Sequence, residues 1–284
     1  MSGPQPEVSV YLPTRNRAHL LREAVESVLA QTFSDFELLI VDDGSEDASA
    51  LELLSRMDPR IRTFRHEQPR GAPAARNYAI REARGCFLTG IDDDDLMLPT
   101  RLESLLTAKP ENYSLVCSSF YLEKNGQRRR YNAKARAITL DDILHQNLID
   151  NQAMMLTERA REIGGFDETL KASQDYDFWT RLIERFGPAY RIAEASYVRR
   201  ESISTDAITW SPRFAEGAQQ YTEKHRSKMN QAQLRSQRLL HKITAREPLR
   251  WHEIPSHWSL ESAPLLLRYL ASQSPAIRRA LRRG

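Results

Sequence analysis

The chain contains few cysteines and no long hydrophobic run. Cys86 and Cys117 are its only two cysteines, and both lie in apolar, strand-like segments. We therefore expect buried thiols in a reducing compartment rather than a disulfide framework or a metal knuckle. No apolar run approaches the roughly 20 residues that cross a bilayer, and the segment 1–7 lacks the basic and apolar parts of a signal peptide. These absences predict a cytoplasmic protein, soluble or attached peripherally to the inner face of the plasma membrane.

A large excess of one charge is also missing. The formal net charge is +3, which is too small to indicate nucleic acid as a partner. Basic residues nevertheless gather at the C-terminal end, where the segment 265–284 holds five arginines and no acidic residue. This segment is either a solvated face or an amphipathic helix that docks on anionic lipid. The arginines are Arg268, Arg278, Arg279, Arg282 and Arg283.

Short apolar strands alternate with helical spacing in the N-terminal part of the chain. Hydrophobic residues make up 40% of the chain and charged residues 28%, which is typical of a globular protein. Nearly continuous apolar strands with amphipathic helices between them favour an α/β fold, with a mostly parallel sheet covered by helices on both faces. The predicted strands are 8–12, 37–41, 61–65 and 86–90, and the predicted helices are 20–29, 50–57 and 71–83.

The alternation becomes less regular after Pro99. Asn125 and Gly126 form a strong hairpin signal, and a helix with an apolar aromatic face follows near 178–186. From 210 to 284 the sequence is polar and helix-permissive, so we expect a sheet domain over 1–209 and a helical, basic C-terminal extension. The strands predicted in this part are 114–121, 127–131, 152–156, 190–193 and 197–200.

Polar residues follow three of the predicted strands at the same edge of the sheet. These sets are Thr14–Arg17, Asp42–Ser45 and Asp92–Asp95. In parallel α/β sheets, ligands bind outside the carboxyl ends of the strands. Three loops that are far apart in the sequence should therefore meet at one crevice, which is the first functional indication in the sequence.

Four consecutive carboxylates make up the third of these loops. Asp92–Asp95 follow the apolar run Cys86–Thr89 closely, and they repel one another unless water or a cation neutralises them. Hard divalent ions prefer oxygen ligands, and Mg²⁺ is usually held by one or two carboxylates together with substrate phosphates. The alternative is an acidic loop that caps a helix beginning near Pro99, where the helix dipole favours negative charge. Taken alone, the cluster favours neither interpretation.

Other polar residues suggest a chemistry if the crevice binds a sugar joined to a nucleoside diphosphate. Mg²⁺ or Mn²⁺ on the aspartates would offset the charge of the departing diphosphate, and Arg76 or the arginines within 15–17 would pair with phosphate oxygens. Asp43 would accept a hydrogen bond from the imide N–H of uracil or thymine. Asp175 would be the general base that takes a proton from the acceptor hydroxyl.

Each of these assignments has a structural alternative. Asp43 precedes a glycine and can serve turn chemistry alone, and Asp175 can be a helix N-cap. Arg76 can be a solvated helical arginine. Phe178 and Trp179 continue an apolar stripe, so we expect them in the core rather than in a sugar site.

Five motifs, in the family's order, resemble the glycosyltransferase family 2 group with the GT-A fold. One such motif alone would be weak, but the ordered set is specific, and it covers roughly residues 7–205. The resemblance is carried by Val8–Arg17, by Ser27–Ser45, by Gly71–Asn77, by Asp92–Asp95 with Pro99, and by Gly164–Asp167 with Asp175–Trp179.

This resemblance implies an inverting, metal-dependent glycosyltransferase with a nucleotide-binding half at about 1–110 and an acceptor-binding half at about 111–209. The donor would be a UDP- or dTDP-sugar. The acceptor would be a glycan or lipid-linked glycan of a bacterial surface polysaccharide, such as lipopolysaccharide, O-antigen or capsule. In the family pattern the nucleotide-sugar contacts Pro13, Thr14, Arg15, Asp43, Asp92 and Asp93, the metal binds Asp94, and Asp175 is the catalytic base. Arg76 is added to the nucleotide-sugar contacts because it can pair with phosphate oxygens.

Two features depart from the family pattern. The four aspartates fit the DxD spelling in two registers, 92/94 and 93/95, and the distance to Pro99 favours the first. Many relatives carry a histidine after the last core strands, but the segment Arg199–Ser204 contains none. We therefore expect either a lower metal affinity or an arginine that contacts the diphosphate instead.

Two rival functions stay open at this point. A non-catalytic nucleotide-sugar-binding or scaffold protein could use the same fold. A nucleotidyltransferase also combines an α/β sheet with an acidic metal site. It would need a glycine-rich loop after the first strand, however, and Pro13–Arg17 contains no glycine.

Overall fold

The computed structural model describes residues 5–149, 152–200, 212–245, 247–258 and 262–273. The chain divides into two compact units. The first unit comprises residues 1–140, 149–168 and 177–203, and the second comprises residues 141–148, 169–176 and 204–284. The C-terminal residues therefore group with two short segments from the middle of the chain.

The first unit is built on a sheet of order β3-β2-β1-β4-β9. The first four of these strands are parallel, with Val8 of β1 opposite both Phe36 and Phe87, whereas β9 runs antiparallel to β4. The predicted parallel sheet is thus confirmed. The strands are β1 (Val8–Thr14), β2 (Phe36–Asp42), β3 (Ile61–Arg65), β4 (Phe87–Gly90) and β9 (Met155–Leu156).

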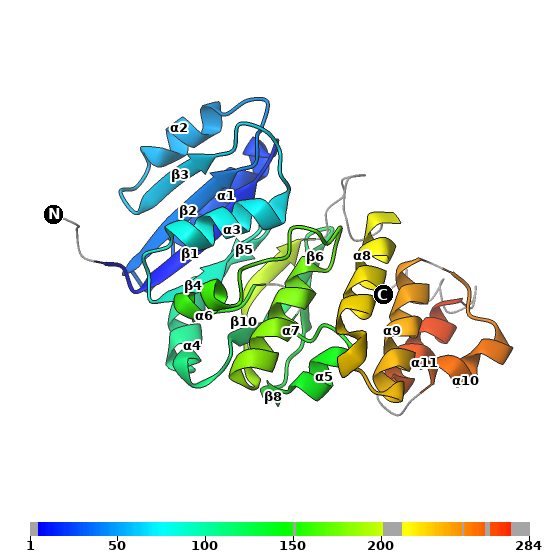
Figure 1. The fold of residues 1–284 in the computed structure, drawn as a ribbon. Helices are drawn as coiled ribbons and strands as arrows, with labels where there is room; N and C mark the ends of the chain where they lie inside the picture. The colour runs from blue at the N-terminus through cyan, green and yellow to red at the C-terminus, as the bar shows by residue number, and fades with distance from the viewer. Residues whose placement is uncertain (1–4, 150–151, 201–211, 246, 259–261, 274–284) are drawn as a thin grey trace. The chain divides into compact units, whose positions relative to one another are not determined.

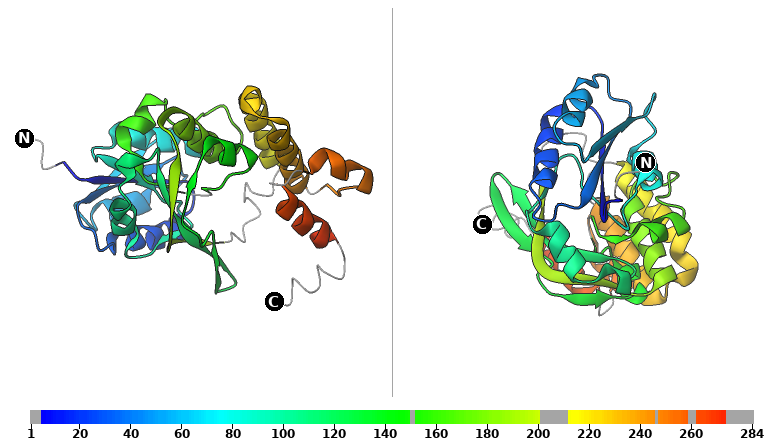
Figure 2. Two further views of the ribbon diagram at one scale, coloured as in Figure 1. Left: turned by 90° about the horizontal axis from the view of Figure 1, so that it is seen from below. Right: turned by 90° about the vertical axis from the view of Figure 1, so that its left-hand side faces the viewer.

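Helices cover both faces of this sheet, as predicted (Figures 1 and 2). The apolar stripes of α1 (Ala18–Leu29) and α2 (Ser49–Ser55) pack on one face, in a buried cluster with β1 and β2. Helix α3 (Ala72–Glu82) packs against the same two strands from the other face. The cluster includes Leu21, Val25, Val28, Leu51 and Leu54 together with Val8, Val10, Leu12, Leu38 and Ile40.

A second, mixed sheet has the order β5-β10-β6-β7, with β8 paired to β10. The predicted hairpin at Asn125 and Gly126 is confirmed as the β6–β7 turn. Two predictions were wrong in detail: 190–193 and 197–200 form one strand whose register shifts near Ala195, and 152–156 is a strand only at its end. The strands are β5 (Leu96–Met97), β6 (Val116–Lys124), β7 (Gln127–Tyr131), β8 (Arg136–Ile138) and β10 (Ala189–Arg200).

Three further helices complete this part of the chain: α4 (Arg101–Thr107), α6 (Thr157–Glu162) and α7 (Gln174–Phe186). Phe178 and Trp179 on α7 are buried, so their expected place in the core is confirmed. Cys117 is buried, but Cys86 is exposed, which corrects the expectation for that thiol. Cys86 precedes β4, so it lies outside the paired strand that buries its neighbours.

The second unit is helical. Tyr176 stacks on Tyr221 with ring centroids 3.8 Å apart, and Gln237 donates a hydrogen bond to the Tyr176 hydroxyl. Leu239, Leu249 and Leu266 form a small apolar core. The basic residues 278–283 lie outside the described residues. The helices are α5 (Leu140–His145), α8 (Pro212–His225), α9 (Gln231–Thr244), α10 (Ile254–His257) and α11 (Ala263–Gln273).

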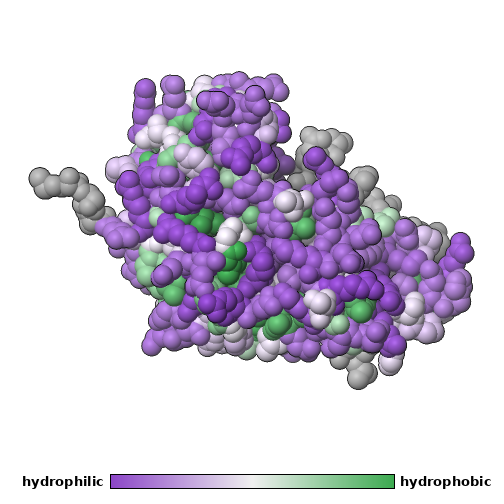
Figure 3. Space-filling model, in the orientation of Figure 1, coloured by the Kyte–Doolittle hydropathy of each residue, from purple (hydrophilic) through white to green (hydrophobic). Residues whose placement is uncertain are grey.

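The exposed surface is mostly hydrophilic on the face seen in Figure 3. Large apolar side chains that do reach solvent, such as Leu53 and Trp251, are few among the described residues. Within the described part of the chain, no helix combines the length and the apolar character that crossing a membrane requires.

A buried asparagine fixes the glycine-rich turn that precedes α7. Asn77 of α3 donates to the carbonyl of Phe166 (2.8 Å) and accepts from its amide (2.7 Å). Gly165 has φ +72°, and a Cβ there would lie 2.3 Å from the Asn77 side-chain oxygen. The turn therefore needs a glycine at this position for its conformation as well as for the close approach of Asn77.

We expect Asn77→Ala to lower the free energy of unfolding by roughly 2–4 kcal/mol, because both backbone groups of Phe166 lose their buried partner. Urea denaturation measures the change. Asn112→Ala is the matched control, since Asn112 is exposed in a short 3-10 helix (Pro110–Asn112). A loss for Asn77→Ala no larger than that of the control would show that the two hydrogen bonds do not hold the turn.

Candidate functional site

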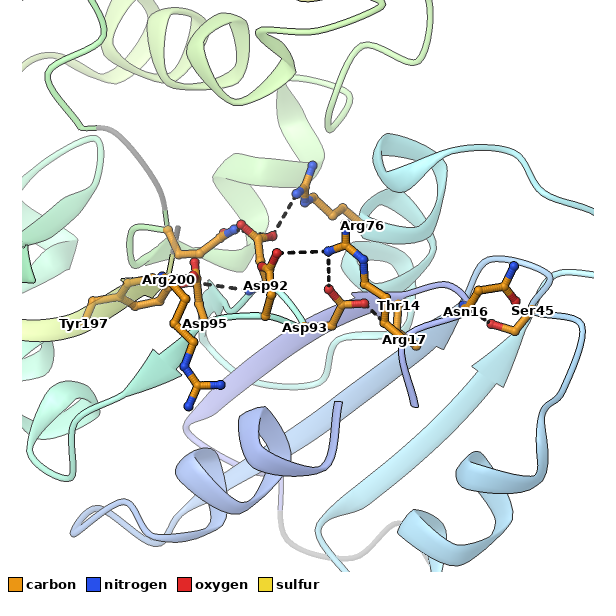
Figure 4. Close-up of polar contacts among 12 residues, drawn as sticks. Thr14, Asn16, Arg17, Ser45, Arg76, Asp92, Asp93, Asp95, Tyr197 and Arg200 are labelled. Atoms are coloured by element: carbon orange, nitrogen blue, oxygen red, sulfur yellow. Dashed lines mark hydrogen bonds and ion pairs between the residues drawn. The ribbon is translucent and has the colours of Figure 1, made fainter. Parts of the chain in front are cut away.

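The aspartate loop, defined here as Asp92–Asp95, leaves the carboxyl end of β4 (Figure 4). The strand ends at Gly90, where a Cβ would lie 2.1 Å from the ring of Tyr11 on the neighbouring strand. A glycine is therefore required for β4 to lie against β1 at this point. This close approach brings the loop beside the residues that follow β1.

Asp93 and Asp94 both form an ion pair with the side chain of Arg17. Arg17 Nη1 lies 3.0 Å from Asp93 Oδ1 and 3.0 Å from Asp94 Oδ2. The second Asp93 oxygen accepts a hydrogen bond from the Thr14 hydroxyl at 2.8 Å. The loops after β1 and β4 thus meet, as the sequence predicted, and Arg17 proves to be the arginine of the 15–17 set that reaches the aspartates.

Asp92 has different partners. Arg76 Nη2 of α3 lies 2.9 Å from Asp92 Oδ1, and Gln152 Nε2 donates to the same oxygen at 3.1 Å. Gln152 in turn accepts a hydrogen bond from the Tyr11 hydroxyl at 2.6 Å. Sequence reasoning selected Arg76 but missed Gln152, since a single glutamine carries no motif.

Asp95 is the most enclosed member of the loop. Its side chain accepts hydrogen bonds from the Tyr197 hydroxyl (2.8 Å) and from the backbone N–H of Arg200 (2.9 Å), both on β10. Burial, followed by repulsion from Asp92 and Asp94, raises the pKa of Asp95 well above its usual value. Asp95 is therefore tied to the second sheet, and its oxygens face protein donors.

A buried arginine, Arg101, contacts Gln152 and Tyr197, two residues that form hydrogen bonds with the aspartate loop. Arg101 at the start of α4 is 1% exposed, donates to Gln152 O at 2.7 Å, and places its guanidinium 4.7 Å from the Tyr197 ring. Burial lowers the pKa of Arg101 to about 10, so it stays charged at neutral pH. Sequence reasoning missed it because an arginine after Pro99 looks like an ordinary residue of a helix's first turn.

The electrostatics of the aspartate loop favour a cation. Burial, followed by the charges of Asp92 and Asp93, raises the pKa of Asp94 to about 6. Burial also raises the pKa of Asp93, against the opposing effect of Arg17. Among the described residues, no group of three histidine, cysteine, aspartate or glutamate side chains is arranged to hold a metal ion. The chemistry of the donor set nevertheless fits a hard cation, because carboxylate oxygens are its preferred ligands. The positive charge of Arg17 already pairs with two of these carboxylates.

The loop after β2 presents Asp43 next to the start of α3. Asp43 Oδ1 lies 2.8 Å from His66 Nδ1 and accepts from Arg70 N at 2.9 Å, while Oδ2 accepts from Gly71 N at 2.7 Å. Burial opposes ionisation, but these hydrogen bonds outweigh it and lower the pKa of Asp43. His66 is a third residue that sequence reasoning missed, after Gln152 and Arg101.

The loops after β1 and β2 are joined directly. Asn16 N donates to the Ser45 hydroxyl oxygen at 2.8 Å (Figure 4), and Asn16 Oδ1 accepts from Glu46 N at 2.9 Å. Pro13 is buried in β1, whereas Arg15 is exposed. A cavity of about 460 Å³ lies beside these loops, with Thr14, Asn16, Arg17, Ser45 and Glu46 among its lining residues. The predicted convergence of three loops is thus confirmed.

Asp175 belongs to the second unit, at the second position of α7. Its Oδ2 accepts a hydrogen bond from Asn147 Nδ2 at 3.1 Å. Of the residues selected from the sequence, the structure brings together Thr14, Arg76, Asp92, Asp93 and Asp94.

Comparison with known proteins gives a consistent result. Residues 9–170 match the family model described as "Glycosyl transferase family 2". Among curated proteins, the chain is similar to the putative colanic acid biosynthesis glycosyl transferase WcaA of Escherichia coli (strain K12). The two are 33% identical over 237 residues, which cover 80% of this chain and 84% of WcaA.

Two solved structures have a similar fold. S. aureus TarS 1-349 in complex with UDP has a TM-score of 0.67 at 19% identity, over 93% of this chain and 79% of that chain. Mannosyltransferase PcManGT from Pyrobaculum calidifontis, in complex with GDP-Man and Mn²⁺, has a TM-score of 0.66 at 20% identity, over 97% of this chain and 83% of that chain. At these identities the likeness establishes the fold alone.

Proposed function

The chain belongs to glycosyl transferase family 2 and has a GT-A fold, and from this premise we propose that it is an inverting, metal-dependent transferase. It moves a sugar from a UDP- or dTDP-sugar to a hydroxyl of a glycan or lipid-linked glycan acceptor. The name of WcaA, which refers to colanic acid, supports a role in bacterial surface polysaccharide synthesis, such as that of lipopolysaccharide, O-antigen or capsule.

The observation that carries this proposal is the aspartate loop and its ion pairs with two arginine side chains. Carboxylates at the end of a central strand repel the phosphates of a donor, so a cation must stand between them. Arg17 and Arg76 lie within ion-pair distance of these carboxylates. A bound Mg²⁺ or Mn²⁺ would neutralise the charge that develops on the departing nucleoside diphosphate.

Asp94 is the proposed metal ligand, in the 92/94 register. Asp95 supports this choice indirectly, because its oxygens are already occupied by Tyr197 and by Arg200 N. Asp94 has Arg17 as its side-chain partner, and its side chain is 21% exposed. It is therefore easier for a metal ion to reach than Asp95, which is 3% exposed.

The nucleotide is proposed to lie over the loops after β1 and β2, in contact with Pro13, Thr14, Arg15, Asp43, Arg76, Asp92 and Asp93. Asp43 accepts three hydrogen bonds, whereas an ionised carboxylate offers about four lone-pair positions. One position is thus left for the imide N–H of a pyrimidine base. Arg15 is exposed and long enough to reach a phosphate or a base.

Asp175 is the proposed general base, acting on the acceptor hydroxyl. Asn147 donates a hydrogen bond to it, which orients the carboxylate. The protein is proposed to work in the cytoplasm, with peripheral membrane contact through the arginines near its C-terminus. Of these, 278–283 lie outside the described residues.

Thermal denaturation with UDP, dTDP and GDP, each with and without Mn²⁺, tests the proposal. GDP is included because PcManGT holds GDP-Man. We expect UDP or dTDP with Mn²⁺ to stabilise the protein, by about 2.7 kcal/mol at a concentration 100 times the dissociation constant. A preference for GDP would correct the donor, and stabilisation that is equal without metal would contradict the metal dependence.

The second candidate is a non-catalytic nucleotide-sugar-binding or scaffold protein of the same family. It predicts the same ligand-dependent stabilisation but no turnover of the donor. The two candidates therefore differ in whether a nucleoside diphosphate is released.

A further inference from the structure

Arg17 occupies the position between two carboxylates of the aspartate loop (Figure 4). It stands at the N-cap of α1, directly after the loop that follows β1. One guanidinium nitrogen, Nη1, contacts both Asp93 Oδ1 and Asp94 Oδ2 at 3.0 Å. A single atom thus serves as the counter-ion of two carboxylates.

One of the two oxygens that Arg17 contacts, Asp94 Oδ2, belongs to the proposed metal ligand, and the other belongs to the neighbouring Asp93. Thr14 already donates to the other Asp93 oxygen, and the remaining partners in the loop belong to Asp92 and Asp95. A divalent ion on Asp94 Oδ2 would stand next to the guanidinium, and the two positive charges would repel each other. Arg17 and the metal ion therefore compete for the same carboxylates.

The side chain of Arg17 is exposed enough to change its partner when a donor binds. Its side chain is 33% exposed, unlike that of Asp93, which is 8% exposed. Arg17 is also among the residues that line the 460 Å³ cavity beside the loops after β1 and β2. Guanidinium groups pair well with phosphate oxygens, in a bidentate geometry that an ammonium cannot match.

We propose that Arg17 is an exchangeable counter-ion, which holds Asp93 and Asp94 in the donor-free protein and transfers to the donor diphosphate when nucleotide and metal bind. This inference rests on the proposed function and deepens it. By binding the Arg17 guanidinium, the nucleotide would free the carboxylates for the metal ion. The metal ion would in turn repel the guanidinium toward the nucleotide. Metal and nucleoside diphosphate thus bind cooperatively, and linkage requires each to raise the affinity of the other by the same factor.

The test measures Mn²⁺ binding by electron paramagnetic resonance of the free ion, without nucleotide and with saturating UDP, dTDP or GDP. We expect wild-type protein to bind Mn²⁺ weakly alone and about 5- to 150-fold more tightly with nucleotide. Arg17→Gln removes the competing charge, so it should bind Mn²⁺ alone about tenfold more tightly, and the nucleotide effect should shrink by a similar factor.

Two further variants serve as controls. Arg17→Lys keeps a positive charge near the carboxylates, so its Mn²⁺ affinity without nucleotide should stay close to that of wild type. Arg22→Gln changes an arginine on the same helix whose ion pair with Glu26 is exposed, and it should behave as wild type throughout. Thermal denaturation of each variant shows whether it is folded.

The outcomes separate this inference from the proposed function. If Arg17→Gln binds Mn²⁺ alone no more tightly than wild type, or keeps the full nucleotide effect, Arg17 is no exchangeable counter-ion, although the transferase proposal survives. If none of UDP, dTDP and GDP promotes Mn²⁺ binding to wild type, the proposed function fails and the inference fails with it.

Discussion

Asp175→Asn is expected to reduce the rate of sugar transfer by about 10²- to 10⁴-fold, the usual contribution of a positioned general base. The amide has nearly the same shape as the carboxylate but cannot take the proton of the acceptor hydroxyl. Binding of the nucleotide should not change, because Asp175 acts on the acceptor. Steady-state kinetics of transfer, together with nucleotide-dependent stabilisation of the folded protein, separate the two effects.

The matched control for Asp175→Asn is Glu184→Gln, which neutralises an exposed acid on the same helix. It should leave transfer within a factor of about two, as is usual for a surface substitution. Normal turnover in Asp175→Asn would remove Asp175 from the mechanism. Reduced turnover accompanied by a large loss of stability would instead assign Asp175 a structural role through Asn147.

Asp94→Asn is expected to abolish metal-dependent binding of the nucleoside diphosphate and to reduce transfer by roughly 10³-fold or more. A metal ion supplies several kcal/mol of charge stabilisation to the transition state, and about 1.4 kcal/mol corresponds to a factor of ten in rate. Mn²⁺ titration in the presence of nucleotide measures the first effect, and transfer kinetics measure the second.

Asp95→Asn is the informative comparison, because it tests the register of the aspartates. An asparagine can still accept from Arg200 N and donate to the Tyr197 hydroxyl, which are the two groups that contact Asp95. We therefore expect metal binding to persist. If Asp95→Asn loses the metal while Asp94→Asn keeps it, the 93/95 register is the correct one.

The parallel sheet could be predicted because its signals are local. Strand β3 has the bounds predicted from the sequence, and the Asn125–Gly126 turn fixed the β6–β7 hairpin. The sequence predicts two strands in place of β10, because polar Glu194 and Ser196 interrupt the apolar pattern. The register shift of β10 lies at the same place. A shift of this kind depends on the partner strand, which the sequence of β10 alone does not reveal.

The charged loops of the site were also predictable, since the aspartates stand together in the sequence. Their partners were harder to find. Gln152 and Tyr197 come from distant parts of the chain and meet the aspartate loop only in the folded protein, and Arg101 donates to Gln152 there. A buried arginine such as Arg101 contradicts the usual rule that arginines are exposed, so composition and spacing pointed away from it.

Release of a nucleoside diphosphate from nucleotide-sugars, measured with and without Mn²⁺, tests the central claim most directly. The account predicts that wild-type protein releases UDP or dTDP from at least one donor when Mn²⁺ is present, and that Asp94→Asn does not. Absence of release from every nucleotide-sugar, with nucleotide binding intact, would contradict catalysis and favour the non-catalytic candidate.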